Sequence, residues 1–331
     1  MIYILCPKGV VTGGTELLHQ LGYELSKYTC SVRLVYIGDS ASESKIPERF
    51  ICYNPILADH IEDNVDSCVI APEIYPQYLM SLKHARRILW WLSVDMYFQH
   101  RQIALVKRFQ LLPARIAIRL DKFYMNILKL NDVIHLSQSK YAEEFLMSKK
   151  IISHSLTDYL NESFLEERPA YSANLRKNQI LYNPKKGMEI TQHFINWFHD
   201  ITFVPLQNMT PKEVVELCKV SKIYIDFGEH PGKDRLPREA SIMGCAVITG
   251  RRGSAGYYED LPIPEEFKFH NPLNSRNQIR AKFQEIFESY DSVISKYAEH
   301  HKMILDEKNR FQTEVNLLWG MLFNKYGSQP R

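Results

Sequence analysis

The sequence lacks any run of about 18 consecutive apolar residues, which is the shortest stretch from which a membrane-spanning helix is expected. No transmembrane helix is therefore predicted. The first residues, Met1–Pro7, are apolar but carry neither a basic leading region nor a small-residue cleavage site. They predict a first strand and not a signal peptide.

Metal-binding signatures are also missing. The six cysteines form no Cys-x-x-Cys pair, no His-Glu-x-x-His sequence occurs, and the twelve histidines show no ligand spacing. Most of the cysteines lie in apolar segments, which predicts reduced and buried thiols. We expect no metal site.

The sequence has only a small excess of positive charge. Lys and Arg number 41 and Asp and Glu number 38, so the formal net charge is +3 and nucleic-acid binding is not indicated. Residues 101–130 are the exception, with seven basic residues against one acidic residue and many interleaved apolar ones. This pattern predicts an amphipathic surface on anionic lipid. A pair of core-packing helices with solvated cations explains it equally well.

What is present is the composition of a folded α/β protein of about two domains: 331 residues, 45% hydrophobic and 24% charged. In both halves, short apolar runs alternate with segments whose apolar residues recur at helical spacing. Strands are predicted at Ile2–Leu5, Val32–Ile37, Ser67–Ala71, Arg87–Ser93, Val133–Leu136, Gln179–Tyr182, Ile201–Val204, Ile223–Asp226 and Ala246–Thr249. Helices are predicted at Glu16–Ser26, Lys140–Ser148, Gly187–Phe198, from Pro211, at Leu236–Met243 and through Asn274–Lys325.

This order predicts two doubly wound parallel sheets, because strand–helix–strand units of this length form right-handed crossovers. We expect domains at residues 1–160 and 175–307, with helix 308–331 packing back on the first and an irregular linker at Ser155–Asn178. Ligands of such sheets bind at the carboxyl ends of the strands. That rule selects three loops, Lys8–Thr15, Asn183–Gly187 and Gly228–Glu239.

The loop at 228–239 carries the most chemistry. Lys233, Arg235 and Arg238 gather at a predicted helix start, where backbone N–H groups already favour an anion such as a diphosphate. Glu239 is placed to accept hydrogen bonds from ribose hydroxyls. The alternative is a solvated loop followed by a helix-start glutamate.

The other two loops give weaker signals. Lys185 and Lys186 follow a predicted strand and are placed to contact a phosphate, although for this loop alone a turn with solvated lysines is the preferred explanation. Gly13 and Gly14 allow a close backbone approach at a helix start. The loop is not Gly-x-Gly-x-x-Gly, so the dinucleotide fingerprint is absent.

Together these loops resemble those of the retaining GT-B glycosyltransferases of family 4, also called group 1. The similarity is sharpest over Ile223–Asp260, where Phe227-Gly228, Glu239-Ala240 and Met243–Thr249 resemble the family signature. The resemblance implies the GT-B fold, two Rossmann-like domains that face each other across a cleft. It also implies a nucleotide-sugar donor as substrate, with no cofactor. No Asp-x-Asp sequence occurs, which argues against the metal-dependent GT-A class.

The resemblance also assigns site residues. Glu239 corresponds to the ribose-binding glutamate, Lys186 to the phosphate-binding lysine, and Ser254 and Ala255 to a turn that binds phosphates by backbone amides. Pro231 stands where the first family glutamate is expected, with Glu229 and Asp234 as substitutes. Leu181 replaces a phosphate-binding arginine, whose charge the basic cluster at 233–238 would supply. The donor-binding set is then Gly13, Gly14, Lys185, Lys186, Glu229, Lys233, Asp234, Arg235, Arg238, Glu239, Ser254 and Ala255.

The expected catalytic residues are Lys186, Arg238, Glu239 and Asp95. Asp95 and His100 would contact the acceptor, unless Asp95 is only a loop residue after an aromatic core strand. The predicted activity is metal-independent, retaining transfer of a sugar to a saccharide or lipid-linked acceptor. We expect it in the synthesis of a bacterial capsule, lipopolysaccharide or O-antigen, in the cytoplasm at the inner face of the membrane. A GT-B-like nucleotide-sugar epimerase and a non-catalytic nucleotide-sugar-binding protein are the alternatives.

Overall fold

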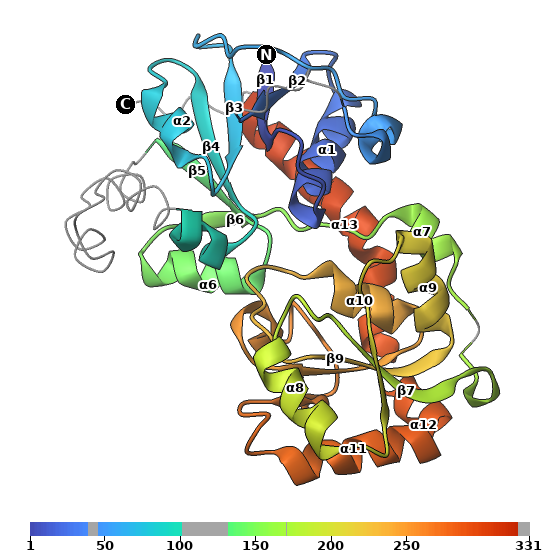
Figure 1. Ribbon diagram of the computed structural model, residues 1–331. Helices are drawn as coiled ribbons and strands as arrows, with labels where there is room; N and C mark the ends of the chain where they lie inside the picture. The colour runs from blue at the N-terminus through green and yellow to red at the C-terminus, as the bar shows by residue number, and fades with distance from the viewer. Residues whose placement is uncertain (39–45, 101–131, 170, 324–331) are drawn as a thin grey trace. The chain divides into compact units, whose positions relative to one another are not determined.

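The computed structural model describes residues 1–38, 46–100, 132–169 and 171–323 (Figure 1). The chain divides into two compact units. The first contains Met1–Asp158 and the residues from Asn309 onward, and the second contains Tyr159–Lys308. Helix α13 (Ala298–Phe323) contributes residues to both units.

The first unit is built on a six-stranded sheet in which all strands are parallel, in the order β2-β1-β3-β4-β5-β6. The strands are β1 (Ile2–Pro7), β2 (Val32–Ile37), β3 (Cys68–Pro72), β4 (Arg86–Trp91), β5 (Val133–Ser137) and β6 (Ser153–Ser155). The helices include α1 (Gly13–Ser26), α2 (Pro76–Ser81), α6 (Lys140–Ser148) and a 3-10 helix at Glu48–Tyr53. Residues 94–100, which follow β4, are also helical. The central strands are buried on both faces, which is why their sequences are continuous apolar runs.

The second unit has a five-stranded parallel sheet in the order β11-β10-β9-β7-β8. Its strands are β7 (Lys177–Tyr182), β8 (Thr202–Pro205), β9 (Ser221–Asp226), β10 (Ala246–Gly250) and β11 (Lys268–Phe269). Its helices are α7 (Glu162–Glu166), α8 (Met188–Trp197), α9 (Pro211–Lys219), α10 (Arg235–Ile242), α11 (Arg276–Glu288) and α12 (Tyr290–Ser295).

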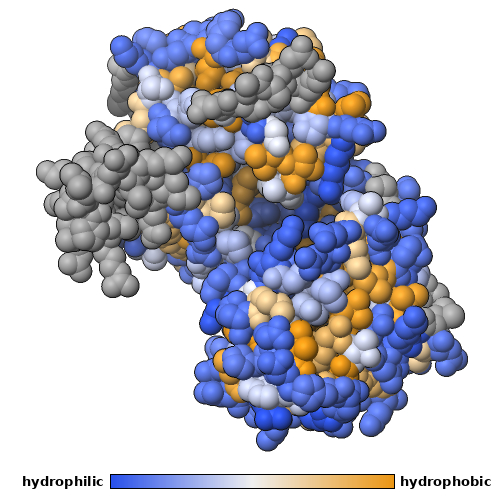
Figure 2. Space-filling view, in the orientation of Figure 1, coloured by the Kyte–Doolittle hydropathy of each residue, from blue (hydrophilic) through white to orange (hydrophobic). Residues whose placement is uncertain are grey.

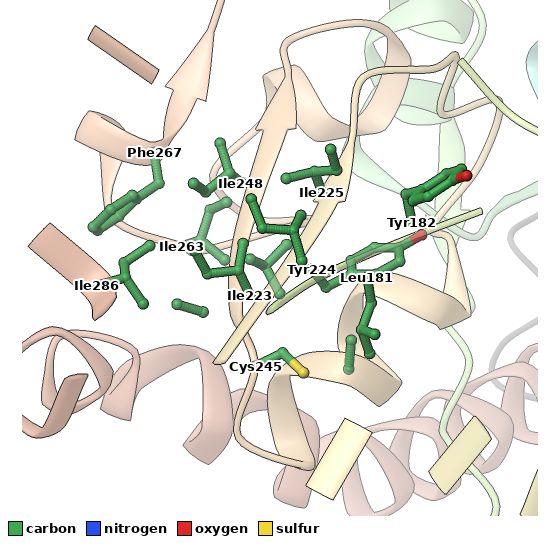
Figure 3. Close-up of a cluster of buried hydrophobic side chains, with 14 of the residues drawn as sticks. Leu181, Tyr182, Ile223, Tyr224, Ile225, Cys245, Ile248, Ile263, Phe267 and Ile286 are labelled. Carbon is green, nitrogen blue, oxygen red and sulfur yellow. The ribbon is translucent and has the colours of Figure 1, made fainter. Parts of the chain in front are cut away.

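The core of the second unit is formed by the central strands, and side chains such as Leu181, Ile223 and Ile248 lie together within it (Figure 3). The strand order reverses between β7 and β9, because the chain adds β8 on one side of β7 and then β9 on the other. Such a reversal is where an open α/β sheet binds its ligand.

Helix boundaries follow local capping chemistry. Thr210 and Glu213 form a reciprocal capping box at the start of α9, and Ser139 caps α6 by accepting a hydrogen bond from Ala142 N at 3.1 Å. Gly244, with φ of +94°, follows α10 in the left-handed conformation that commonly ends a helix. These three helix boundaries lie within one residue of the sequence predictions.

One prediction about a segment was wrong. Ser155–Asn178 is not an irregular linker throughout, because residues 156–160 are buried and α7 follows them. The indole of Trp90 donates a hydrogen bond to Leu156 O at 2.9 Å, which fixes this segment. The prediction that Asn274–Lys325 is helical is confirmed over the described residues, where the stretch forms α11, α12 and α13 with breaks near Ser289 and before Ala298.

Hydrophilic side chains cover much of the visible surface of each unit, with hydrophobic ones scattered among them (Figure 2). Among the described residues, no helix combines the length and the apolar character needed to cross a membrane. The basic segment at 101–130 lies outside the described residues.

Candidate functional site

Lys186 and Asp226 meet at the carboxyl ends of the two strands that flank the reversal of strand order. Lys186 lies in the loop after β7, and Asp226 is the last residue of β9. The Nζ atom of Lys186 lies 3.0 Å from Oδ2 of Asp226 and also forms an ion pair with Asp234. A cationic side chain is thereby held at the place where this kind of sheet binds its ligand.

Two glycines allow the lysine to reach this position. Gly187 has φ of +65°, and a Cβ atom there would lie 2.4 Å from the backbone nitrogen of Gly228. A Cβ atom on Gly228 would lie 2.5 Å from Cγ of Lys186. The loops after β7 and β9 therefore approach closer than any side chain would allow, and this contact places Lys186 against Asp226.

Asp226 is buried and Asp234 is partly buried, and both are well supplied with donors. Asp226 accepts hydrogen bonds from Gly228 N at 3.1 Å and from the Tyr224 hydroxyl at 3.3 Å. Asp234 Oδ2 lies 3.0 Å from Nδ1 of His230. Burial raises the pKa of Asp234, but the His230 hydrogen bond and the Lys186 charge lower it by more. Burial lowers the pKa of Lys186, and the two carboxylates raise it above its usual value.

Asp226, His230 and Asp234 also form a candidate cation site, since their ligand atoms lie within 4.8 Å of one another. The Lys186 ammonium contacts two of these three residues. A divalent cation could bind there only by displacing that ammonium, because the two positive charges repel each other. The arrangement therefore already contains a cation, and it is part of the protein.

Lys233 and Arg238 are placed differently from the prediction that they gather around an anion. Both are buried, and both contact Oε1 of the buried Glu307 on α13, Lys233 at 2.8 Å and Arg238 at 2.7 Å. The Arg238 guanidinium also donates to the backbone carbonyls of Lys233 and Asp234, each at 3.1 Å. In this arrangement they hold the loop in place, and a ligand would reach them only if the loop moved.

The turn at Gly253–Gly256 packs on the same loop. Gly253 has φ of +58°, and a Cβ atom there would lie 2.0 Å from His230 O. Ser254 N donates to His230 O at 2.9 Å, and its hydroxyl donates to Gly232 O at 2.6 Å. Ala255 is fully buried. The loops after β9 and β10 are thus joined into one structure.

The remaining predicted donor residues of the second unit lie around this structure. Arg235 donates to Tyr159 O at 3.4 Å, and Glu239 is half-buried on α10. Glu229 is exposed and pairs with Arg252 at 2.8 Å. Lys185 is exposed. Of the two substitutes for the missing first glutamate, Asp234 is the one in contact with Lys186.

In the first unit, Gly13 and Gly14 are the first residues of α1, after the N-cap residue Thr12. Asp95 follows β4 and accepts a hydrogen bond from the Tyr141 hydroxyl at 3.0 Å. His100 is exposed. The two glycines are thus helical and do not form the predicted turn, and Asp95 and His100 lie in a helical stretch over residues 94–100 and not in a loop. These contacts do not by themselves indicate a ligand.

Sequence reasoning missed Asp226, His230 and Glu307. Asp226 carries a signal, because a charged residue at the end of an apolar strand is unusual unless it has a partner. His230 and Glu307 carry none, since each lies in a stretch rich in polar residues and its burial follows only from the tertiary structure.

No protein-family model matches the sequence, and no curated protein sequence matches it. Solved structures do. A glycosyltransferase from Rickettsia africae matches with a TM-score of 0.62 and 12% identity over 98% of this chain and 99% of that one. Sucrose-phosphate synthase from Thermosynechococcus elongatus matches with a TM-score of 0.63 and 13% identity over 98% and 99%.

A third match is HepE from Anabaena, solved in complex with UDP-glucose, with a TM-score of 0.58 and 10% identity over 96% of this chain and 98% of that one. Identities this low show a shared fold, and here it extends over nearly the whole of each chain. The prediction of fold class is confirmed: this chain has the GT-B fold, the fold of these glycosyltransferases.

Proposed function

We propose that this protein is a glycosyltransferase that moves a sugar from a nucleotide sugar to a saccharide or lipid-linked saccharide. The GT-B fold supports this, as does the binding of UDP-glucose by the structural neighbour HepE. The observation that carries the proposal is the Lys186 ammonium, held at the reversal of strand order in the second unit.

The donor diphosphate binds at Lys186 and replaces carboxylate oxygens as the partner of its ammonium. The raised pKa of Lys186 keeps the side chain charged at neutral pH. Glu239 binds the ribose hydroxyls, and the backbone amides around Ser254 and Ala255 lie on the same loop assembly as the phosphate site. The nucleotide sugar is a substrate, so no cofactor is needed.

Catalysis is mainly electrostatic. As the bond between the sugar and the diphosphate breaks, negative charge develops on the leaving phosphate, and a preorganised cation stabilises it. Lys186 supplies this charge where a metal ion does so in other transferases. Transfer with retention of configuration follows from the family resemblance, as does a role in bacterial surface-polysaccharide synthesis.

The acceptor is assigned to the first unit, where Asp95 follows β4. The basic segment at 101–130 is proposed to bring the protein to anionic lipid at the cytoplasmic face of the membrane, where a lipid-linked acceptor would be found. Liposome flotation with and without anionic lipid tests this directly. Equal binding to liposomes with and without anionic lipid, or binding that high salt does not weaken, would contradict it.

The activity test is transfer from a panel of nucleotide sugars, including UDP-glucose, to mixed saccharide and lipid-linked acceptors, followed by mass spectrometry. Wild type and Lys177→Ala, a control at an exposed lysine at the start of β7, are expected to transfer sugar, and Lys186→Ala is not. An epimerised nucleotide sugar in reactions without acceptor would favour the epimerase. Nucleotide binding with no turnover of any donor would favour a binding protein.

A further inference from the structure

The polypeptide passes between the two units at two places, Asp158/Tyr159 and Lys308/Asn309. On the second-unit side, both places are held by one short segment, Lys233–Arg238. Arg235 donates a hydrogen bond to the carbonyl of Tyr159, the first residue of that unit, at 3.4 Å. Lys233 and Arg238 both contact Glu307, which lies two residues before the second boundary.

The contact at Glu307 is a buried ion cluster. The Glu307 side chain is 1% exposed, and the Lys233 and Arg238 side chains are 3% and 0% exposed. Lys233 Nζ and Arg238 Nη1 share a single carboxylate oxygen, Oε1. Removing one member of such a cluster leaves buried charge without its partner, so the three side chains are strongly interdependent.

The same segment carries the carboxylate that holds Lys186. Arg238 donates through Nε to the carbonyl of Asp234 and through Nη2 to that of Lys233. The Asp234 side chain in turn contacts Lys186 and His230. A continuous set of polar contacts therefore leads from Glu307 on α13, through Arg238 and Asp234, to the proposed phosphate-binding lysine.

On the first-unit side, the two connecting segments are bound to each other. Glu314 of α13 accepts hydrogen bonds from Thr157 N at 2.6 Å, from the Thr157 hydroxyl at 2.9 Å and from the Ser155 hydroxyl at 2.7 Å. Each connecting segment is thus held on both sides of its boundary. Within the second unit, the segment 233–238 contacts both connecting segments, at Tyr159 and at Glu307.

We infer that Lys233–Arg238 is an anchor that joins the donor site to both connecting segments, with Glu307 as a positioning residue for the Asp234–Lys186 pair. This rests on the proposed function, in which a diphosphate takes Lys186 from its carboxylates. When Asp234 loses that partner, the change is passed through Arg238 to Glu307 and through Arg235 to Tyr159. Nucleotide binding then alters the stability of segments that contact no nucleotide.

Hydrogen–deuterium exchange of the full chain, with UDP as the probe, tests this inference. In wild type, UDP should slow amide exchange about threefold or more at 228–240 and also at 156–161 and 303–312. In Glu307→Gln, UDP should still slow exchange at 228–240 but not at 303–312, with affinity lowered about tenfold. Arg235→Gln, which keeps Glu307, should lose the UDP effect at 156–161 only.

The control is Arg280→Gln, which removes an exposed ion pair with Asp200 in the same unit and should leave every UDP effect intact. A purely structural Glu307 would change basal exchange in the variant and leave the UDP-dependent difference unchanged, which would overturn the inference. Protection by UDP at 228–240 without any change at the connecting segments of wild type would also overturn it.

An arm without nucleotide separates this inference from the proposed function. In ligand-free protein, Glu307→Gln should speed exchange at 156–161, which Glu307 does not contact, through Arg238 and Arg235. If that occurs while UDP and other nucleoside diphosphates protect nothing, the anchor stands and the proposed donor site fails. If exchange at 156–161 stays as in wild type, the anchor fails whatever the nucleotide does.

Discussion

The ammonium of Lys186 lies 3.0 Å from the Asp226 carboxylate, across the gap between the ends of β7 and β9. These strands are neighbours in the sheet but are separated in the chain by α8, β8 and α9. The pair therefore lies at the point where the strand order of the sheet reverses. In the proposed function, a diphosphate competes with Asp226 and Asp234 for the same cation.

Replacement of Lys186 by Ala should affect both stability and binding. The free energy of unfolding should fall by about 1–3 kcal/mol, because the buried Asp226 and the partly buried Asp234 lose a charged partner. Calorimetric titration should show that UDP binding is lost. Lys177→Ala, at an exposed position at the start of β7, should retain both properties. Unchanged UDP affinity in Lys186→Ala would contradict the assignment.

Gly187 should tolerate no side chain. Gly187→Ala should lower the free energy of unfolding by about 3 kcal/mol, since its Cβ atom would overlap the Gly228 backbone as well as force a left-handed conformation. Gly9→Ala is the matched control, because Gly9 has a similar φ of +69° and nothing within 4 Å of a Cβ atom. The control should cost only about 1 kcal/mol. Urea unfolding of both variants measures the difference, and equal losses would show that the close approach is unimportant.

Glu239 should make the site distinguish ribose from deoxyribose. If its carboxylate accepts hydrogen bonds from the ribose, wild type should bind UDP about tenfold more tightly than 2′-deoxy-UDP. Glu239→Ala should bind the two nucleotides equally. Competition binding measures both ratios, and a preference that survives in the variant would assign ribose recognition to other residues.

Burial of Glu73 predicts an unusual pH dependence of stability. Glu73 follows β3 and accepts a hydrogen bond from Leu92 N at 3.0 Å, and burial raises its pKa to about 8. Because the folded pKa lies above the ordinary value of 4.5, the native state binds this proton more tightly than the unfolded chain. The stabilisation is complete below pH 4.5 and is lost as the pH rises to about 8.

Glu73→Gln should remove that loss and be more stable than wild type above about pH 8, by on the order of 3 kcal/mol. Urea unfolding across the pH range tests this. Glu62→Gln, at an exposed position of the same unit, serves as the control. Parallel pH profiles for wild type and Glu73→Gln would show that Glu73 does not titrate in this range.

Sugar transfer by wild type should not require a metal ion, and metal binding should appear only when Lys186 is replaced by Ala. Chelation by EDTA should leave sugar transfer unchanged, because the Lys186 ammonium already lies against Asp226 and Asp234. Lys186→Ala removes the ammonium from Asp226 and Asp234, two of the three potential ligands, so added Mn²⁺ or Zn²⁺ should raise its melting temperature. Activity that requires a divalent cation in wild type would contradict the role assigned to Lys186.

The architecture could be predicted from the sequence because each buried parallel strand is a short apolar run between turn residues. Val32–Ile37 and Lys140–Ser148 have the predicted bounds. The residues at 156–160 could not be predicted as buried, because their partners, Trp90 and Glu314, are far along the chain.

The site shows the same division. Lys186 follows from a strand end and a lysine–glycine pair, whereas its carboxylate partners depend on which strands become neighbours. Lys233 and Arg238 stand near a helix start, as an anion site requires, and only the tertiary structure shows that they contact Glu307. Sequence patterns locate charge, but they do not show which charges are already paired.

The most direct measurement is a crystal structure of the protein with bound UDP. We predict that a diphosphate oxygen lies within hydrogen-bonding distance of Lys186 Nζ, with the lysine released from at least one of its two carboxylates and the ribose beside Glu239. UDP bound at any other place, with Lys186 still paired to both Asp226 and Asp234, would contradict the proposed function.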